Sequence, residues 1–216
     1  MRVLELFSGT GSVGKVSKER GYEVISLDLK GADINISILD WNYKTYPPGY
    51  FDIIWASPPC HSFSILRDSW IGRKLKSHGG KVFSKELLQK DIQEKGLPIL
   101  RKAEEIIDYF KPSFYFIENP QTGRMKEYID KPYYDVDYCK YADWGYRKRT
   151  RIWTNVEKFE PKMCKKDCNS ISNGRHILHV GFSSKSKNKK GTSLKDRYRV
   201  PPKLINELFD TFDKKK

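Results

Sequence analysis

The feature that most constrains the fold is a rigid turn placed directly after a short apolar run. Residues 51–55 (Phe-Asp-Ile-Ile-Trp) are predicted to form a buried strand, and Ala-Ser-Pro-Pro-Cys follows at 56–60. Paired prolines cannot continue a sheet ladder, so the chain must leave the strand there. Open α/β sheets bind ligands just beyond the carboxyl ends of their strands. The turn therefore presents the Cys60 thiol at the rim of a sheet, although a lone cysteine is more often a small buried hydrophobe.

A glycine-rich turn follows the first expected strand, at 3–7, and leads into a helix over roughly 13–20. Its residues are Phe7, Ser8, Gly9, Thr10 and Gly11. Glycines let the backbone pass close to a ligand, and the helix that follows offers free N–H groups. Strand, Gly-x-Gly and helix together indicate a nucleotide site, although Gly14 falls one position late for the full dinucleotide fingerprint. A tight turn without a ligand is the alternative.

Two acidic residues end the next two segments. The strand expected at 22–28 ends in Asp28, where such folds place an acid that binds a ribose, and Asp40-Trp41 ends a third segment. Asp40 is suited to accept a hydrogen bond from an adenine amino group. The alternatives are a solvated loop carboxylate for Asp28 and a turn cap for Asp40.

Two later strands carry further polar residues. An apolar run at 114–117 is followed by Glu-Asn-Pro at 118–120, so Glu118 lies at the same sheet edge as Cys60 if the strands are parallel. On a strand that ends near 153, alternation separates two sets of side chains. One side carries Arg147, Arg149 and Arg151, and the other carries Lys148, Thr150 and Ile152. A row of arginines suits an anionic or carbonyl-bearing ligand better than a solvated edge.

The composition indicates an intracellular protein. The chain has 216 residues, enough for one domain or for one domain and a small appendage. No run of about 18 apolar residues is present, so no membrane span is expected, and the N-terminus opens directly into a strand without a visible signal peptide. Four cysteines, one of them in the Pro-Pro-Cys turn, do not make a disulfide framework. We therefore expect a reducing compartment and no membrane partner.

The charge points to a polyanionic partner, and nucleic acid is the leading candidate. The formal net charge is +14. Residues 61–83 have no clear periodicity and resemble a mobile polar loop, a candidate lid over DNA. The loop's basic residues are Arg67, Arg73, Lys74, Lys76 and Lys81. A second basic run lies at 185–190.

The segment 155–196 changes character, because it is rich in Lys, Ser and Asn and poor in apolar residues. It holds Cys164-x3-Cys168 and His176-x2-His179, which approach the four-ligand pattern of a structural zinc site. The His-x2-His spacing is one residue shorter than usual, which leaves open that one ligand comes from elsewhere. Metal binding would supply free energy that so few apolar residues cannot. A disordered basic tail with incidental Cys and His is the alternative.

Taken together and in order, these motifs resemble those of the DNA cytosine-5 methyltransferase family, over about residues 3–153. Phe7-Ser8-Gly9-Thr10-Gly11 resembles the cofactor loop, and Pro58-Pro59-Cys60 matches the Pro-Cys nucleophile motif. Asp28 and Asp40 stand where the family places acids near the ribose and the adenine. Glu118-Asn119-Pro120 resembles Glu-Asn-Val. Arg149-x-Arg151 matches the arginines of Gln-x-Arg-x-Arg, with Arg147 in the place of Gln.

The resemblance implies an α/β fold of the Rossmann-like class I type, with a mostly parallel sheet, helices on both faces and a small basic appendage. It implies S-adenosylmethionine held at Phe7–Gly11, Asp28, Asp40, Trp41 and Pro58. A Cys60 thiolate would add to C6 of a cytosine flipped out of double-stranded DNA. Glu118 would protonate N3 if burial favours its protonated form, and Arg151, supported by Arg149, would hold O2.

The chain also departs from the family pattern. Only about 40 residues stand in the place of a recognition domain, the ninth motif is not recognisable, and the last helix only loosely suggests the tenth. We therefore predict a catalytic domain at 1–154, an insert at 155–196 and a returning helix at 197–216, as in short phage or large-virus members acting as monomers in the cytoplasm or nucleus of a host cell. A catalytically silent binding protein and an RNA cytosine-5 methyltransferase remain the alternatives.

Overall fold

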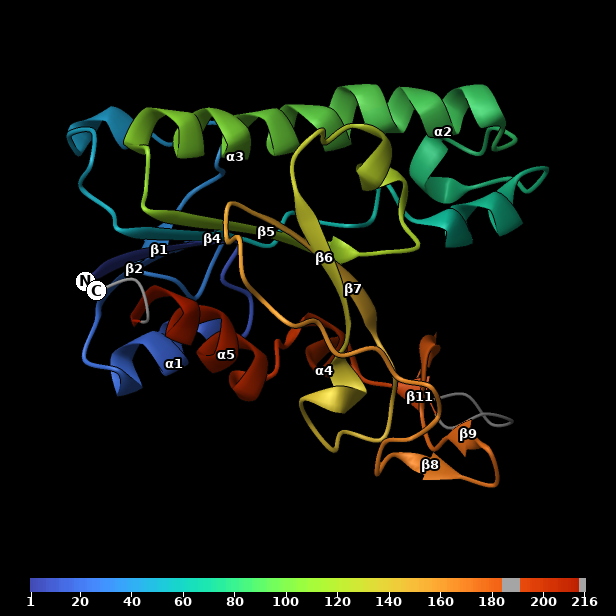
Figure 1. Cartoon of the computed structure of the whole chain (residues 1–216). Helices are drawn as coiled ribbons and strands as arrows, with labels where there is room; N and C mark the ends of the chain where they lie inside the picture. Colours follow the sequence, from blue (N-terminus) through green and yellow to red (C-terminus); the bar gives the residue numbers. More distant parts are fainter. Residues whose placement is uncertain (184–190, 214–216) are drawn as a thin grey trace.

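The chain folds around one seven-stranded sheet. The computed structural model describes residues 1–183 and 191–213 (Figure 1). The strand order is β3-β2-β1-β4-β5-β7-β6. The strands are β1 (Arg2–Leu6), β2 (Glu23–Asp28), β3 (Ile34–Asn35), β4 (Ile53–Ala56), β5 (Phe114–Pro120), β6 (Tyr133–Asp137) and β7 (Arg149–Thr154). All neighbours are parallel except that β7 runs antiparallel to both β5 and β6. The mostly parallel sheet expected from the sequence is confirmed.

Helices cover both faces of the sheet. The helices α1 (Ser12–Glu19) and α5 (Pro202–Asp213) lie on one face, below the sheet in Figure 1. Their apolar sides, including Val16 and Leu204, pack on Trp55 and Phe116 from the central strands. The opposite face is covered by α2 (Lys85–Asp91) and α3 (Leu97–Phe110). Each face of the sheet therefore has its own apolar core, as in doubly wound α/β proteins.

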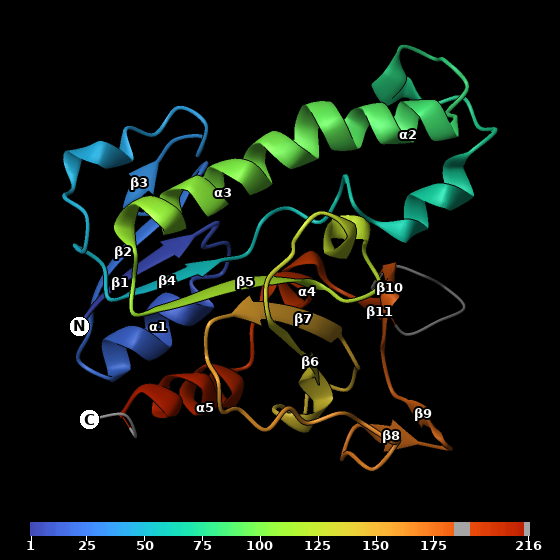
Figure 2. The same cartoon turned by 45° about the horizontal axis from the view of Figure 1, so that its top comes forward.

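The helices α2 and α3 form one long rod (Figure 2). A π-helical segment, η4 (Ile92–Gly96), joins them, and Pro98 lies in the first turn of α3, where a missing N–H costs no helical hydrogen bond. Gly96 packs so closely on Phe63 that an added Cβ would lie 2.9 Å from the ring. The rod is thus held against the segment that follows Cys60.

Short helical turns make up most of the connections. They are η1 (Tyr43–Thr45), η2 (Ile65–Trp70), η3 (Lys76–His78), η5 (Arg124–Glu127) and η6 (Tyr138–Lys140).

The loop 61–83 contains η2 and η3 and is anchored to α2. The Arg67 guanidinium is buried and forms an ion pair with Asp91, which also pairs with His78 and Lys95. Burial alone would raise the pKa of Asp91, but the hydrogen bonds from Lys95, Arg67 and His78 hold it well below its usual range. Arg67 is therefore not available to a DNA phosphate, which corrects its place among the candidate DNA-binding side chains.

The described residues of the insert at 155–196 extend from one end of the sheet. They contain β8 (Ile171–Ser172), β9 (Arg175–His176), β10 (His179–Ser183) and β11 (Gly191–Thr192), and α4 (Leu194–Tyr198) follows (Figures 1 and 2). The basic run at 185–190 lies outside the described residues. Among the helices that the structure describes, none has the length and apolar content to cross a membrane. The domain division at 154 and 196 stays a prediction.

Candidate active site

The glycine-rich turn and Asp28 form one hydrogen-bonded unit. The Gly9 N–H donates to Asp28 Oδ2 at 2.8 Å, and the Leu29 N–H donates to Oδ1 at 2.7 Å. Gly9 and Gly11 have φ angles of 50° and 65°, a left-handed backbone that glycine adopts without strain. Phe7 shares this conformation with φ 59°. The turn and the acid after β2 thus meet at one sheet edge, as the sequence predicted.

A buried carboxylate, Glu5, supports this turn from β1. It accepts hydrogen bonds from the Val13 N–H at 3.1 Å and the Gly14 N–H at 2.9 Å, at the start of α1. Burial raises the pKa of Glu5 from 4.5 to about 7. Sequence reasoning passed over Glu5; the signal was an acidic residue inside an otherwise apolar strand.

The pair Asp40-Trp41 lies beyond β3. Asp40 is exposed, whereas the Trp41 ring is buried and packs edge-on against Tyr43, with 6.1 Å between the ring centroids. Trp41 therefore contributes its side chain to the core under the expected adenine position.

The Pro-Pro-Cys turn is tied to the neighbouring strand. β4 and β5 are parallel, with Ala56 opposite Ile117, so Cys60 follows the carboxyl end of β4 and Glu118 lies near the carboxyl end of β5, at the same edge of the sheet. The Asn119 side-chain amide donates to the Pro58 carbonyl oxygen at 2.8 Å. This bond fixes the turn against the strand that carries Glu118. Burial raises the pKa of the Cys60 thiol above its usual range, and the positive charges of Lys148 and Arg197 offset only part of this rise.

Glu118 is buried between a phenol and a lysine. Its Oε1 accepts a hydrogen bond from the Tyr138 hydroxyl at 3.0 Å and lies 3.1 Å from Lys148 Nζ. The Lys148 ammonium also lies over the Tyr138 ring, 4.8 Å from its centroid. Both partners are nearly fully buried. Sequence reasoning missed Tyr138 and placed Lys148 on the side away from the ligand.

The structure does not bring Arg149 and Arg151 to Glu118. Arg149 pairs with Asp137 at 2.8 Å, and Arg151 pairs with Asp135 at 2.8 Å, both on β6. The reason is the sheet register, in which Glu118 lies opposite Ile152 on β7. Side chains alternate along a strand, so the face that Glu118 shares carries Lys148, Thr150 and Ile152, and the arginines face the other way.

The segment after the insert returns to the glycine-rich turn. The Val200 N–H donates to Ser12 Oγ at 3.2 Å, and a Cβ added to Gly9 would lie 4.0 Å from Tyr198 Cβ. The Nε of Arg197 is buried and has no hydrogen-bond partner within the described part of the chain. This segment therefore packs against the glycine-rich turn and the start of α1.

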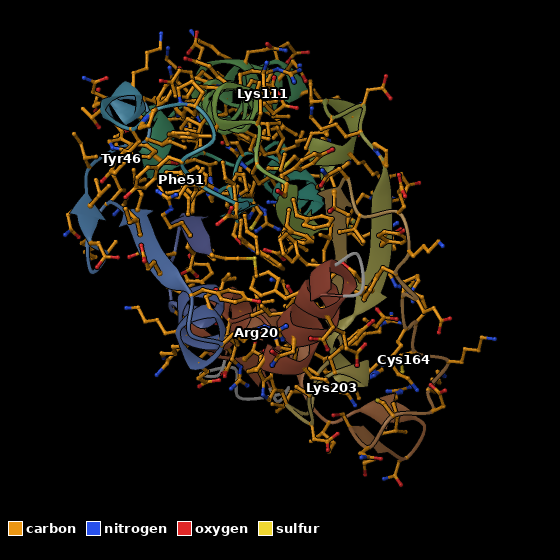
Figure 3. All side chains as sticks on the ribbon, turned by 60° about the vertical axis from the view of Figure 1, so that its left-hand side comes forward. Arg20, Tyr46, Phe51, Lys111, Cys164 and Lys203 are labelled. Carbon is orange, nitrogen blue, oxygen red and sulfur yellow. The ribbon has the colours of Figure 1, made fainter. Side chains whose placement is uncertain are left out.

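A separate group of metal-ligating side chains lies in and beside the insert. Single ligand atoms of Cys139, Cys164, Cys168 and His176 all lie within 4.8 Å of one another. Three of the four expected residues are thus brought together, but Cys139 takes the place expected for His179. The expectation for His179 failed because the fourth ligand, the sulfur of Cys139, comes from η6, which is distant in sequence. Figure 3 shows Cys164, within the insert, well apart from Tyr46 and Phe51.

Comparison with known proteins gives one close relative. The chain is 48% identical to a probable DNA (cytosine-5)-methyltransferase from Frog virus 3 (isolate Goorha), over 97% of this chain and 99% of the relative. No protein-family model matches the chain.

Solved structures give more distant similarities. One is a methyltransferase from Entamoeba histolytica, with 16% identity and a TM-score of 0.48, aligned over 76% of this chain and 55% of the other. Another is a putative DNA modification methyltransferase encoded in an E. coli prophage, with 16% identity, a TM-score of 0.45, and 76% and 51% coverage. The chain thus spans about half the length of these two proteins. From its identity to the viral relative over nearly the full length of both, the chain belongs to the DNA (cytosine-5)-methyltransferase family.

Proposed function

We propose that this protein transfers a methyl group from S-adenosylmethionine to C5 of cytosine in DNA through a covalent bond between Cys60 and C6. The observation that carries the proposal is the Pro-Pro-Cys turn, locked by Asn119 beside the buried Glu118. The viral relative is named for this activity.

C5 of cytosine is too weak a nucleophile to take a methyl group unaided, so the enzyme must first activate the ring by adding a nucleophile of its own at C6. Addition of the Cys60 thiolate to C6 breaks the ring's aromaticity and makes C5 enamine-like. A proton or hydrogen bond from Glu118 at N3 takes up the charge that develops in the ring. C5 then bonds to the methyl carbon as the sulfonium bond breaks. Loss of the C5 proton to a base expels the thiolate and restores the ring.

We propose that Lys148 is the cation in this site, in the place that the sequence predicted for Arg151. The Lys148 ammonium and the Tyr138 hydroxyl both donate hydrogen bonds to Glu118 Oε1, which leaves Oε2 to contact the target cytosine. The Lys148 charge also lowers the pKa of the Cys60 thiol and so favours the thiolate. Arg149 and Arg151, paired with aspartates on the other face, hold β7 to β6.

S-Adenosylmethionine supplies the methyl group when bound, and the chain offers residues that fit it. The left-handed glycines open the turn Phe7–Gly11 to a close approach of the cofactor. The N–H groups of Val13 and Gly14 at the start of α1 are not free, contrary to the expectation from the sequence, because they donate to Glu5, so the turn itself is the part that borders the cofactor. Asp28 is held at this turn in position for the ribose hydroxyls. We propose that Asp40 and the Trp41 backbone border the adenine and that Pro58 borders the methyl group.

Duplex DNA is the proposed partner, in a host cell as for the viral relative. Base flipping is required because the thiol must reach C6, which is stacked inside a duplex. The exposed basic residues of the loop 61–83 suit phosphate contacts. RNA methylation and catalytically silent binding are the rival functions.

The test uses a tritiated methyl donor with duplex DNA and with a folded RNA as separate substrates. DNA carrying 5-fluorocytosine is the mechanistic probe, because fluorine at C5 cannot leave as a proton and the adduct persists. We expect methyl transfer to DNA and a denaturation-resistant complex with the wild type, and neither with Cys60→Ser, which should still bind the cofactor. Turnover by Cys60→Ser contradicts the covalent mechanism, transfer only to RNA contradicts the substrate, and no transfer at all favours silent binding.

We also propose that Cys139, Cys164, Cys168 and His176 hold a structural zinc ion. Zinc–sulfur bonds of 2.3 Å imply ligand atoms about 3.8 Å apart in a tetrahedron. His176 Nε2 lies 3.4 Å from Cys168 Sγ and 3.6 Å from Cys164 Sγ, which fits this geometry. Elemental analysis of protein purified without added metal should give close to one equivalent of zinc. Less than about a tenth of an equivalent, with Cys164 and Cys168 freely alkylated, contradicts the site.

A further inference from the structure

The catalytic carboxylate and the metal cluster are joined through adjacent residues. Tyr138 donates its hydroxyl hydrogen to Glu118 Oε1 at 3.0 Å, and Cys139, the next residue, belongs to the cluster. Both lie in η6, directly after β6, and both are buried. A single helical turn therefore carries one side chain into the active site and the next toward the insert.

Asp137, the residue before Tyr138, strengthens the same link. Its carboxylate is fully buried and accepts hydrogen bonds from the Cys164 N–H at 2.8 Å and from Arg149. Its own N–H donates to the Lys162 carbonyl oxygen at 3.0 Å. The insert is thus bonded to residues 137–139 at two backbone positions and at the cluster.

On the active-site side, Tyr138 also contacts Lys148, the other partner of Glu118. The Tyr138 N–H donates to the Lys148 carbonyl oxygen at 3.1 Å, and the Tyr138 ring lies under the Lys148 ammonium. Hence the position of one residue, Tyr138, sets the geometry of both partners of Glu118.

We propose that metal bound at Cys139, Cys164, Cys168 and His176 is a clamp that positions Tyr138 and, through it, Glu118; this rests on the proposed methyl transfer. The first residues of the insert pack on the core through Val156 and Phe159, but without metal the side chains of the cluster have only weak contacts with one another. A hydrogen bond weakens steeply once its atoms separate beyond about 3.2 Å, so a small displacement of η6 is enough to release Glu118. Tyr138 is a positioning residue in this arrangement.

Two variants separate the clamp from the chemistry. Cys168→Ser removes a ligand that lies in the insert, away from residues 137–139, and should lose the zinc. Tyr138→Phe removes only the hydroxyl and should keep it. We expect each to lower kcat about tenfold or more, the usual effect of losing a group that orients a site, with KM for the methyl donor little changed. The double variant should be no slower than Cys168→Ser, because both changes break the same link.

Three controls accompany these variants. Cys60→Ser removes a thiol outside the cluster and should retain zinc while losing methyl transfer. Ser172→Ala, in the insert but outside the cluster, should keep zinc and kcat. Hydrogen exchange of amides 137–141 reports the clamp without turnover, and we expect faster exchange in Cys168→Ser than in the wild type.

The outcomes are distinguishable. Loss of zinc in Cys168→Ser with unchanged kcat and unchanged exchange at 137–141 overturns the clamp, as does a double variant whose defect is the product of the two single defects. A Cys164–Cys168 disulfide in the purified wild type overturns it as well. A wild type that holds zinc but transfers no methyl group refutes the proposed function instead, and the exchange experiment then still decides the clamp.

Discussion

The buried carboxyl of Glu5 makes the stability of this fold depend on pH in a calculable way. Its pKa rises from 4.5 to about 7 on folding because the side chain, only 3% exposed, is removed from water. At 1.36 kcal/mol for each pH unit, this difference corresponds to about 3 kcal/mol. The folded chain holds the proton more tightly, so this contribution to stability is complete below pH 4.5 and is lost as the pH rises through 7.

Glu5→Gln removes this titration and keeps the size of the side chain. Glutamine can accept one of the two N–H bonds at the start of α1, so we expect a constant offset in stability and no pH-dependent part from this position. The measurement is urea unfolding followed by tryptophan fluorescence from pH 4.5 to 8. The free energy of unfolding of the wild type, minus that of the variant, should fall by about 3 kcal/mol across this range.

The matched control is Glu23→Gln, which changes the same chemical group at an exposed site on β2. Its unfolding free energy should run parallel to that of the wild type at every pH. If the Glu5→Gln curve is also parallel to the wild-type curve, the burial argument for Glu5 is refuted.

Three further outcomes are expected. Gly14→Ala places a Cβ 2.7 Å from Glu5 Oε2 and should lower the free energy of unfolding by about 1–3 kcal/mol, despite alanine's better helix propensity. Lys15→Ala is the control, and a melting temperature of Gly14→Ala equal to or above that of the wild type counts against the close contact. Arg67→Met should cost about 3 kcal/mol in urea unfolding, whereas Met at the exposed Arg73 should cost almost nothing; equal costs contradict the buried ion pair. DNA affinity should fall steeply with salt, by about 0.9 log units per phosphate contact for each log unit of salt, and a flat response contradicts phosphate binding. Glutamine at three exposed loop positions should reduce that slope: Lys74, Lys76 and Lys81.

Sequence reasoning located the parts of the site that local pattern determines. The turn at Gly9, the acid at Asp28 and the turn at Cys60 each follow a short apolar strand, and a parallel sheet necessarily collects such positions at one edge. The placement of Glu118 at the same sheet edge as Cys60 followed from the same rule. The observed β4–β5 pairing confirms it.

The register of the strands, and contacts between residues far apart in the sequence, could not be predicted from local pattern. Alternation correctly separated Arg149 and Arg151 from Lys148, but it cannot say which set faces Glu118, since a shift of one residue exchanges the faces. Cys139 escaped notice because its partners lie in the insert, and no local spacing connects η6 to Cys164. The buried pair of Arg67 and Asp91 depends equally on contacts between separate segments.

The insert runs along β6, and this position is expected to protect the protein from aggregation. β6 is an edge strand, and unpaired edges are templates for association with other chains. Here Lys162 accepts from the Asp137 N–H, and the Tyr134 hydroxyl donates to the carbonyl oxygens of Val156 and Glu157, so residues 156–162 occupy part of the position that an added strand would take. The opposite edge, β3, is only two residues long. A chain whose insert detaches from β6 would therefore expose an unpaired strand edge. Removal of the proposed zinc during purification is expected to give oligomers and precipitate rather than a soluble monomeric apoprotein.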